Sequence, residues 1–581
     1  MKNIYFERKN FFNKKKDIYI ADWCLSDKEL IKYRVGSKYL VNYQLNNHQK
    51  ILISKYLRKI INIQFQKIYK KINKYHDVKN SSRYWKIILL PFLNLLIPFI
   101  FIRWRIIELI KNKNKYLANI YEINDQEFAF NSLSDMKFDS SLSSLIFSKI
   151  IEYRNDLKYI KKNNFKKKKI NLKNNLSKII NFLNLKIINF INNLSSIFFK
   201  NKFLLINIGL PFFRTILLNL SLKQFPYVWS EILNNTQEFN FERRKMLISK
   251  KKGNNFNNFI DTVIYLLIPK NYLENYQTII KLLPKFQFSK ETKIITAYNY
   301  KNDDQFKILV AEMKKRFDCK YYILQHGGGY GIDKFINEEM YIKKIADKFL
   351  TWGWRDEKIK NIKSFFYLKY YNKNLFSDVN LTNKILFIYH YFEKYPLRVT
   401  SQPNTNSERI KNILKIIKFF NLIDDNIKFK KYPFTLRYIK KDEKFWNQNF
   451  NENIFPKGVN FDDGKLELFD AIKKNKYRLI IHDSNSTTFL ETMFYNVPSI
   501  VILNTKIQTS RKEFNFFKNQ FFKNKIFFSS ELMAAKFVNH NIANIQEWWF
   551  SNNIQRLRTS FCDNYIKTST NIKNEFLKLL I

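Results

Sequence analysis

In the second half of the chain, short apolar runs alternate with amphipathic segments of helical spacing, and this rhythm predicts βαβ units around a parallel sheet. A first series comprises expected strands at residues 262–268, 293–297 and 320–324 and an expected helix at residues 304–317. A second series has expected strands at residues 385–390, 427–432, 478–482 and 499–503, and expected helices at residues 407–421, 465–473 and 487–495. We therefore expect two consecutive α/β domains that face each other across a cleft.

The chain of 581 residues is too long for one ordinary domain. A short strand and loop are expected at residues 17–24, and long apolar stretches of helical spacing predict a mostly helical insertion at about 45–220. Within it, residues 161–202 are low in complexity. The predicted organisation is an N-terminal Rossmann-like domain over residues 1–375, a second one over residues 376–544, and C-terminal helices over residues 545–581 that pack across the interface.

The formal net charge is +53, from 102 Lys and Arg against 49 Asp and Glu, and such a charge invites a nucleic-acid role. However, a hydrophobic content of 45% and an aromatic content of 17% exclude a disordered polycation. Only 19 of the basic residues are Arg, the residue better suited to bidentate phosphate or base recognition. The lysines are spread along the chain, which favours a solvated surface and no specific nucleic-acid partner. Attraction to anionic lipid or to a phosphate-rich substrate stays open.

Cys24, Cys319 and Cys562 lie far apart, with no paired spacing, which predicts a reducing compartment, no disulfide and no metal site. No apolar segment of the secretory type precedes the lysines at residues 14–16, so we expect a cytoplasmic protein. The apolar run at residues 87–102 has sixteen residues, where a membrane span needs about 20. A buried or re-entrant core helix, a contact with the inner leaflet and a true span are the alternatives, so peripheral membrane association stays open.

A glycine-rich turn, QHGGGYG at residues 325–331, holds four of the ten glycines of the chain. Glycine lets backbone N–H groups approach a ligand, so the turn predicts a substrate-contacting or phosphate-contacting loop, with a plain tight turn as the alternative. The expected substrate-binding residues share this turn and are Gln325, Gly327, Gly328, Gly329 and Tyr330. The turn lacks the patterns of a Walker loop and of a dinucleotide fingerprint.

His326 opens this turn at the predicted carboxyl end of a strand, where open α/β sheets bind their ligands. An imidazole there could remove a proton from an acceptor hydroxyl or stabilise a leaving phosphate. We therefore predict His326 as the catalytic residue, with a purely structural role as the alternative.

The segment from His482 to Leu503 reads as strand, Ser/Thr-rich loop, helix and strand. Its loop meets a helix N-terminus, which offers N–H groups and a positive dipole end to a phosphate, and Glu491 could accept hydrogen bonds from a sugar diol. A capping box of Thr488 and Glu491 is the structural alternative. Cations after neighbouring strands could neutralise a diphosphate leaving group. The expected donor-binding residues are Arg398, Lys431, Asp483, Ser484, Ser486, Thr487, Thr488 and Glu491.

Several segments together resemble a family of transferases encoded in bacterial O-antigen and surface-polysaccharide gene clusters. The segments are QHGGGYG with the following IADKFLTWGW, SQP at residues 401–403, STTFLETMFYNVPSI, AAKFVN, the WW pair at residues 548–549 and SFCDNY. The early WC pair, RYWKIILLPFL and IPKNYLENY are also similar to it. The resemblance covers most of the chain and is weakest over residues 110–204.

This resemblance implies a GT-B-like fold, with the acceptor mainly on the first Rossmann-type domain and the donor mainly on the second. The HG turn is also similar to that of CDP-glycerol glycerophosphotransferases, which implies His326 as the base and Ser484, Ser486 and Thr487 as phosphate-binding residues. Three glycines after His326 and the lack of a close TDYSS-type motif depart from that pattern.

The expected activity is metal-independent transfer of a sugar or polyol-phosphate unit from a nucleotide-activated donor to a polysaccharide or lipid-linked acceptor, without a further cofactor. The alternatives are a basic nucleic-acid-binding or membrane-surface-binding protein on an α/β scaffold, and a nucleotide-sugar epimerase or hydrolase.

Overall fold

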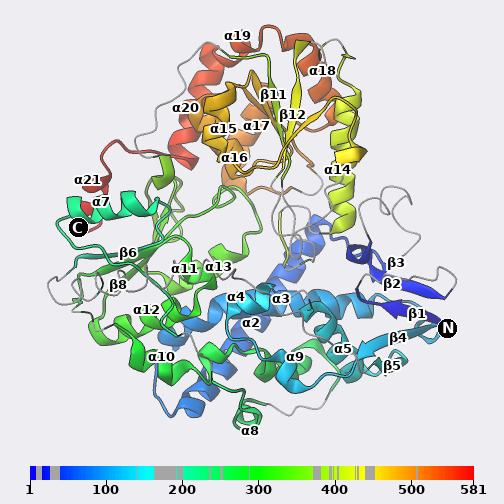
Figure 1. Cartoon of the computed structure of the whole chain (residues 1–581), viewed down its shortest axis with the longest axis vertical. Helices are drawn as coiled ribbons and strands as arrows, with labels where there is room; N and C mark the ends of the chain where they lie inside the picture. The colour runs from blue at the N-terminus through cyan, green and yellow to red at the C-terminus, as the bar shows by residue number, and fades with distance from the viewer. Residues whose placement is uncertain are drawn as a thin grey trace, which may run out of the picture.

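The computed structural model contains three parallel sheets in the part of the chain that it describes, each with helices beside it (Figure 1). The described part is residues 1–581 except 8–15, 26–38, 139–140, 163–191, 193–200, 234–236, 249–252, 285, 287, 371–380, 391–395, 397, 402–404, 426, 428–430, 439–451, 506–507 and 581. We name the sheets A, B and C in chain order. Sheet A lies near the N-terminus, sheet B lies beside the C-terminus, and sheet C forms the top of the molecule in the view of Figure 1.

Sheet C has the strand order β13-β12-β11-β14-β15-β16, which is the 3-2-1-4-5-6 order of a Rossmann fold. Its strands are β11 Ile385–Ile388, β12 Phe434–Arg437, β13 Asn460–Asp462, β14 Leu479–His482, β15 Ser499–Ile502 and β16 Phe527–Phe528. Its helices are α14 Asn406–Asn421, α15 Leu468–Asn475, α16 Thr487–Tyr495, α17 Asn515–Lys523 and α18 Glu531–Asn541. The central strands are buried on both faces, as their continuous apolar runs predict.

Most elements expected here are confirmed within two or three residues. Of the strand expected at residues 427–432, residues 428–430 lie outside the described residues, and Ile427, Lys431 and Tyr432 are not in a strand. The strand that the structure describes in this region is β12, which begins at Phe434. Directly before it, the Pro433 carbonyl accepts a hydrogen bond from the Ile385 N–H. Phe434 and Leu436 are fully buried, whereas Lys431 is exposed, because sheet formation selects the residues that both faces can cover. Lys431 therefore precedes the strand instead of ending it.

Sheet B has the order β10-β9-β8-β7-β6. Its strands are β6 Phe203–Ile206, β7 Lys293–Thr296, β8 Lys320–Leu324, β9 Lys348–Thr351 and β10 Ile362–Ser364, with helices α12 Asp304–Phe317 and α13 Asn337–Ile345. The expected strands that became β7 and β8, and helix α12, are confirmed. The strand expected at residues 262–268 is wrong, because this run belongs to α9 Phe256–Leu267, whose first turn is capped by the Asn255 side chain. A short apolar run fits a buried helix as well as a buried strand.

Sheet A is the main departure from the expected organisation. Its strands are β1 Lys2–Tyr5, β2 Asp17–Ala21, β3 Tyr39–Val41, β4 Tyr116–Tyr121 and β5 Tyr159–Lys162, in the order β3-β2-β1-β4-β5. Its region also contains α2 Asn47–His76, α3 Ser82–Glu108 and α5 Leu142–Arg154. The strand expected at residues 17–24 is confirmed as β2, but the insertion at 45–220 is not simply helical, since β4, β5 and β6 lie within it. Most of the low-complexity stretch at residues 161–202 lies outside the described residues.

The apolar run at residues 87–102 lies within α3, a helix of 27 residues. By length and composition α3 could cross a membrane, yet 89% of its most apolar window is buried inside the protein. Pro98 cannot donate to the Asn94 carbonyl, and the Asn337 side chain of α13 donates to that carbonyl instead, at 2.6 Å. The structure therefore uses α3 as a core helix.

The last residues of the chain touch both sheets B and C. They form α19 Ile545–Trp549, α20 Asn552–Tyr565 and α21 Ile572–Leu577. On α20, the Phe561 ring lies 5.9 Å from that of Phe489 on α16, and on α21 the Phe576 ring lies 5.9 Å from that of Phe203 on β6. All strands of sheets A and B precede residue 375, and those of sheet C fall within residues 376–544. The boundaries themselves stay predictions.

Candidate functional site

The glycine-rich turn after β8 lies against the N-terminus of α16, which follows β14. The Gly328 N–H donates to the Thr487 hydroxyl at 2.8 Å, although these residues are far apart in sequence. Each segment lies at the carboxyl end of a strand in its own parallel sheet, the place where such sheets position ligands. The two segments in which the sequence predicted substrate-binding and donor-binding residues are therefore in direct contact.

His326 is half-buried and is surrounded by tyrosine rings. Its Nδ1 lies 3.0 Å from the Tyr300 hydroxyl and 3.4 Å from the Tyr330 hydroxyl. Burial raises the pKa of both tyrosines well above the usual value, so their hydroxyls stay protonated. The tyrosines fix the orientation of the imidazole through one of its two nitrogens.

A buried carboxylate lies close to this histidine. Glu338 of α13 pairs with Lys301 at 2.6 Å and also with Arg398. Burial alone would raise the pKa of Glu338, but Arg398, Lys301 and His326 together hold it well below the usual range. Arg398, expected to bind the donor, thus lies in the His326 neighbourhood with its guanidinium on Glu338.

The glycines of the turn are explained mainly by packing. A Cβ on Gly328 would lie 2.8 Å from the Thr487 Cα, and one on Gly331, where φ is +77°, would lie 2.6 Å from the Trp354 ring. A Cβ on Gly329 would lie 2.8 Å from an Asp333 carboxylate oxygen. Gly327 differs, because a Cβ there would meet nothing closer than the Tyr330 ring at 3.7 Å. Close approach of protein to protein therefore accounts for most of the cluster that the sequence associated with a ligand.

Gln325 is 3% exposed and holds the turn together. Its side-chain amide donates to the Gly327 carbonyl at 2.8 Å, and its side-chain oxygen accepts from the Trp354 indole at 2.7 Å. The expected substrate contact of Gln325 is therefore replaced by a positioning role. Tyr330, with its contact to His326, has a similar role.

At the N-terminus of α16, the three hydroxyl residues Ser486, Thr487 and Thr488 are partly exposed. Ser486 is the N-cap, and its side chain makes no capping hydrogen bond, so the expected capping box of Thr488 and Glu491 is wrong. The Thr488 hydroxyl instead lies 3.0 Å from that of Ser486 and 3.4 Å from His482 Nδ1. The first-turn N–H groups are thus not capped by the side chain that usually does so.

Glu491, one turn further along α16, is 5% exposed and reaches across to the unit of sheet B. It accepts a hydrogen bond from the Tyr367 hydroxyl at 3.3 Å and lies 3.9 Å from the Lys369 Nζ. Glu467 also pairs with Lys369, at 3.1 Å. Burial would lower the pKa of Lys369, but the two carboxylates raise it, so this cation stays charged.

Asp483 and Ser484 are buried beneath the loop, with 2% and 1% exposure. Asp483 accepts hydrogen bonds from the His390 N–H and the Asn412 amide, both at 2.9 Å, and burial raises its pKa to about 7. These contacts tie β11 and α14 to β14, which supports the loop from behind.

Lys431 is not brought to the site. It precedes β12 and therefore lies at the amino edge of sheet C, whereas the loop of Asp483 follows the carboxyl end of β14. Its Nζ lies 5.8 Å from the centre of the Tyr432 ring. The error in the position of the strand is the cause of the error in the position of the lysine.

Sequence reasoning missed three residues of the site: Tyr298, Tyr300 and Lys369. Tyr298 and Tyr300 follow the carboxyl end of β7, and the Tyr298 ring lies 5.7 Å from that of His326. The rule that singled out His326 could have found both, since the strand before them was predicted. Lys369 follows β10, a strand that no expected element covered.

The two units are further joined beside the turn. Asp333 forms an antiparallel bridge with Ser510, and the Arg511 guanidinium pairs with Glu339 at 2.6 Å. Ser401 of the SQP motif accepts a hydrogen bond from the Phe335 N–H at 2.9 Å, while residues 402–403 of that motif lie outside the described residues.

A histidine oriented at one sheet edge, with its loop in contact with an uncapped helix N-terminus, is typical of α/β enzymes whose site lies where the carboxyl ends of two parallel sheets meet. Comparison with models of protein families identifies the family. The model described as the LIC12162 family transferase matches residues 7–580, and the chain belongs to this family. The protein is therefore a transferase, and the sequence-based assignment to a transferase family is confirmed.

Individual relatives are distant. Protein Ycf2 of Physcomitrium patens is 24% identical over a match of 460 residues that covers 68% of this chain and 20% of Ycf2, so the chain spans about a fifth of that relative. Among solved structures, the wall teichoic acid polymerase TagF is 10% identical, with a TM-score of 0.29 and coverage of 70% of this chain and 94% of TagF. The spinosyn rhamnosyltransferase SpnG is 8% identical, with a TM-score of 0.29 and coverage of 50% and 72%. By strand order, sheet C is the Rossmann-type sheet and sheet A has the matching order 3-2-1-4-5, whereas the strands of sheet B lie side by side in the order of the sequence.

Proposed function

We propose that this transferase is GT-B-like and moves a sugar or polyol-phosphate unit from a nucleotide-activated donor to a surface-polysaccharide or lipid-linked acceptor of the O-antigen type. The observation that carries the proposal is the juxtaposition of His326 with the N-terminus of α16 through the contact of Gly328 with Thr487. One side of this junction can take a proton, and the other can hold a phosphate.

In the proposed reaction, the acceptor hydroxyl gives its proton to His326 Nε2 as its oxygen attacks the donor. The bond from the transferred group to the nucleotide phosphate breaks, and the phosphate leaves with the electron pair. Ionised Glu338 stabilises the imidazolium that forms, while Tyr300 holds the ring through Nδ1. The leaving charge falls at the first turn of α16, where N–H groups and the helix dipole stabilise it.

The donor site proposed here is smaller than the set expected from the sequence. Ser486, Thr487 and Thr488 are the partly exposed residues that would contact phosphate. Lys369 stays charged beside Glu491 and would complete the electrostatic environment of a diphosphate. Asp483 and Ser484 would act by supporting the loop.

The first prediction concerns the base. His326→Ala should lower transfer by at least about 100-fold, because a positioned general base contributes roughly 10²–10⁴. Nucleotide binding, measured by calorimetry, should stay unchanged, since the histidine faces the acceptor. The donor is first identified by a thermal-shift screen of CDP-, UDP-, GDP- and CMP-linked compounds. The matched control is His540→Ala, at an exposed position of α18.

Wild-type turnover in His326→Ala would contradict the assignment of His326 as the general base. Bulky replacements of Ser486 and Thr487 should weaken nucleotide binding, and unchanged binding contradicts the donor site. Nucleotide release without any acceptor would favour a hydrolase over a transferase.

We also propose that the protein is cytoplasmic and contacts the inner leaflet through α7 Phe212–Ser221. Phe213, Leu217 and Leu220 lie at the spacing of one helix face and are 67%, 49% and 54% exposed. An exposed apolar helix face on a protein of net charge +53 suits an anionic lipid surface.

A further inference from the structure

A cavity of about 660 Å³ lies beside sheet A, among residues that the site described above does not use. Its walls come from the loop after β3, the first turns of α2, the last turns of α3 and residues 254–256. This volume falls within the range of sites that hold a small organic ligand.

One wall of the cavity is a continuous group of aromatic rings. The Phe101 ring lies 5.5 Å from that of Tyr56 and 5.1 Å from that of Phe256, and the Trp104 ring lies 5.8 Å from that of Phe256. Tyr56 is 40% exposed, so part of this wall faces solvent. Such a wall offers flat apolar faces to a ligand.

The remaining lining combines five amide side chains with four aliphatic ones, Leu45, Leu52, Ile53 and Leu109. The five amides are Asn42, Gln44, Gln49, Asn254 and Asn255. An amide both donates and accepts hydrogen bonds, as a hydroxyl group does. The Gln44 Nε2 and the Tyr43 hydroxyl are screened from solvent and have no hydrogen-bond partner within the described chain. Tyr43 is only 5% exposed, and a buried polar group without a partner is costly.

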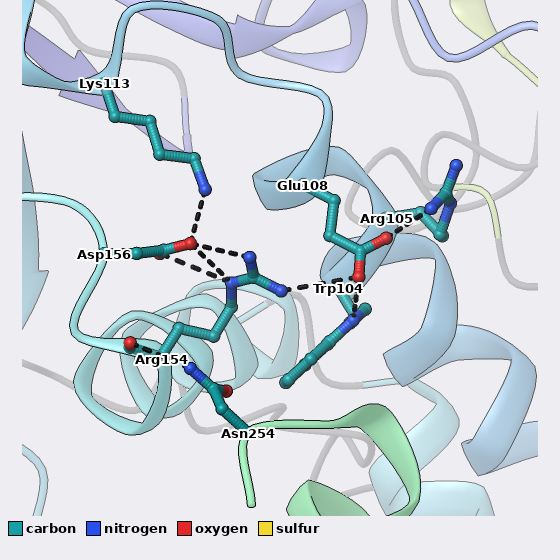
Figure 2. Close-up of polar contacts among 7 residues, drawn as sticks. All are labelled: Trp104, Arg105, Glu108, Lys113, Arg154, Asp156 and Asn254. Atoms are coloured by element: carbon teal, nitrogen blue, oxygen red, sulfur yellow. Dashed lines mark hydrogen bonds and ion pairs between the residues drawn. The ribbon is translucent and has the colours of Figure 1, made fainter.

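The charged residues of the lining neutralise each other. Arg105 pairs with Glu108, and Glu108 also accepts a hydrogen bond from the Trp104 indole at 2.6 Å and contacts Arg154 at 3.4 Å (Figure 2). Asp156, paired with Arg154 and Lys113, lies behind them. The network fixes the Trp104 ring at the edge of the cavity and leaves no unpaired cation among the charged lining residues that the structure describes.

We infer that this cavity is a binding site for a neutral saccharide of about two sugar rings. Sugar rings have apolar faces that stack on aromatic rings and hydroxyls that both donate and accept, which matches the aromatic and the amide parts of the lining. An acyl chain would use only the apolar part of this lining and none of the amide groups. An anion would meet Glu108, with Arg105 already paired. This inference is independent of the proposed chemistry at His326, because it concerns binding alone.

The test is saturation-transfer-difference NMR on the full chain. The probes are maltose, cellobiose, lactose and the methyl glycosides of glucose, galactose, rhamnose and N-acetylglucosamine. At least one probe should give a signal from its ring protons, and Tyr56→Ala should reduce that signal at least fivefold. Gln44→Met, which keeps the length of the side chain and removes the amide, should also reduce it. The control is Phe516→Ala, an aromatic residue that is 63% exposed on α17, away from the cavity lining.

If none of these probes gives a signal, the inference is overturned. An undiminished signal in both Tyr56→Ala and Gln44→Met overturns it as well. Binding of glucuronate, glycerol phosphate or a dodecyl-chain amphiphile, with no binding of the neutral probes, shows a different class of ligand and also overturns the inference.

Discussion

Gly328 lies so close to Thr487 that its lack of a side chain is a requirement of the junction between the two units. A Cβ there would fall 2.8 Å from the Thr487 Cα and 2.9 Å from its nitrogen, both backbone atoms that cannot rotate away. Gly328→Ala should therefore lower the free energy of unfolding by about 1–3 kcal/mol, as overpacking does. Gly327→Ala is the matched control, since its nearest neighbour is 3.7 Å away. Denaturant unfolding measures both, and equal stability of the two variants contradicts this account.

Three buried groups beside β14 give the protein a specific dependence of stability on pH. Burial lowers the pKa of His482 to about 3 and that of His390 to about 4, and it raises the pKa of Asp483 to about 7. The histidines contribute stability that is present above their ordinary pKa of 6.5 and is lost as pH falls through that value toward 4 and 3. Asp483 acts oppositely, because its contribution is present below 3.8 and is lost as pH rises to about 7.

His482→Gln should therefore flatten the loss of stability between pH 6.5 and 4 by about 1.4 kcal/mol per pH unit relative to wild type. Asp483→Asn should steepen it by a similar amount over the same interval. Urea unfolding at several pH values measures the slopes, with His540→Gln as a control at an exposed position. Parallel slopes in all four proteins would show that these groups do not control the pH dependence.

At the scale of elements, the proposed contact with the inner leaflet depends on helix α7. Phe213→Glu with Leu217→Glu should lower co-sedimentation with phosphatidylglycerol vesicles at least tenfold, because two large apolar side chains contribute about 1.5–3 kcal/mol each when buried. Phe516→Glu on α17 is the control, since it adds the same charge at a residue that is 63% exposed. Binding retained in the double variant and lost in high salt would assign the contact to lysines alone.

The elements also show where sequence reasoning succeeds. Strands β8, β11, β14 and β15 are continuous apolar runs next to clear amphipathic helices, so their period is unambiguous. Sheet A could not be predicted in the same way, because β3 has three residues and lies beside the long helices α2 and α3, whose apolar content dominates the pattern. The strand predicted at residues 262–268 is wrong because a run that is buried on all sides is equally apolar as a helix and as a strand.

The candidate site divides along the same line. His326 and the loop before α16 were predicted because each directly follows a recognised strand. Lys431 was misplaced because its strand was misplaced, and Lys369 was missed because β10 is short and only partly buried. The packing role of Gly328 depends on a residue more than 150 positions away, which no local pattern shows.

At the scale of the whole molecule, the units of sheets B and C are held together beside the site by a small polar contact. The Arg511 guanidinium pairs with Glu339 and donates to the Asp333 carbonyl at 3.2 Å, next to the bridge of Asp333 with Ser510. Glu339 is 1% exposed, so removal of Arg511 leaves its carboxylate with Lys343 as its remaining ion-pair partner in the described chain. A buried carboxylate that loses one of two cationic partners loses part of the attraction that offsets its desolvation.

Arg511→Met should therefore open this junction without unfolding either sheet. Hydrogen exchange should rise at least tenfold at two amides that bond across the units, the Lys334 N–H to the Thr509 carbonyl and the residue-511 N–H to the Ile332 carbonyl. It should stay unchanged in β8 and β14. Lys512→Met is the control, because the neighbouring side chain is exposed. Uniformly faster exchange in the strands as well would mean that Arg511 supports global stability, whereas unchanged exchange at the junction would show that the bridge and the contact of Gly328 with Thr487 suffice. Since the proposed donor would enter between these units, a selective opening should also change the KM for the donor more than kcat.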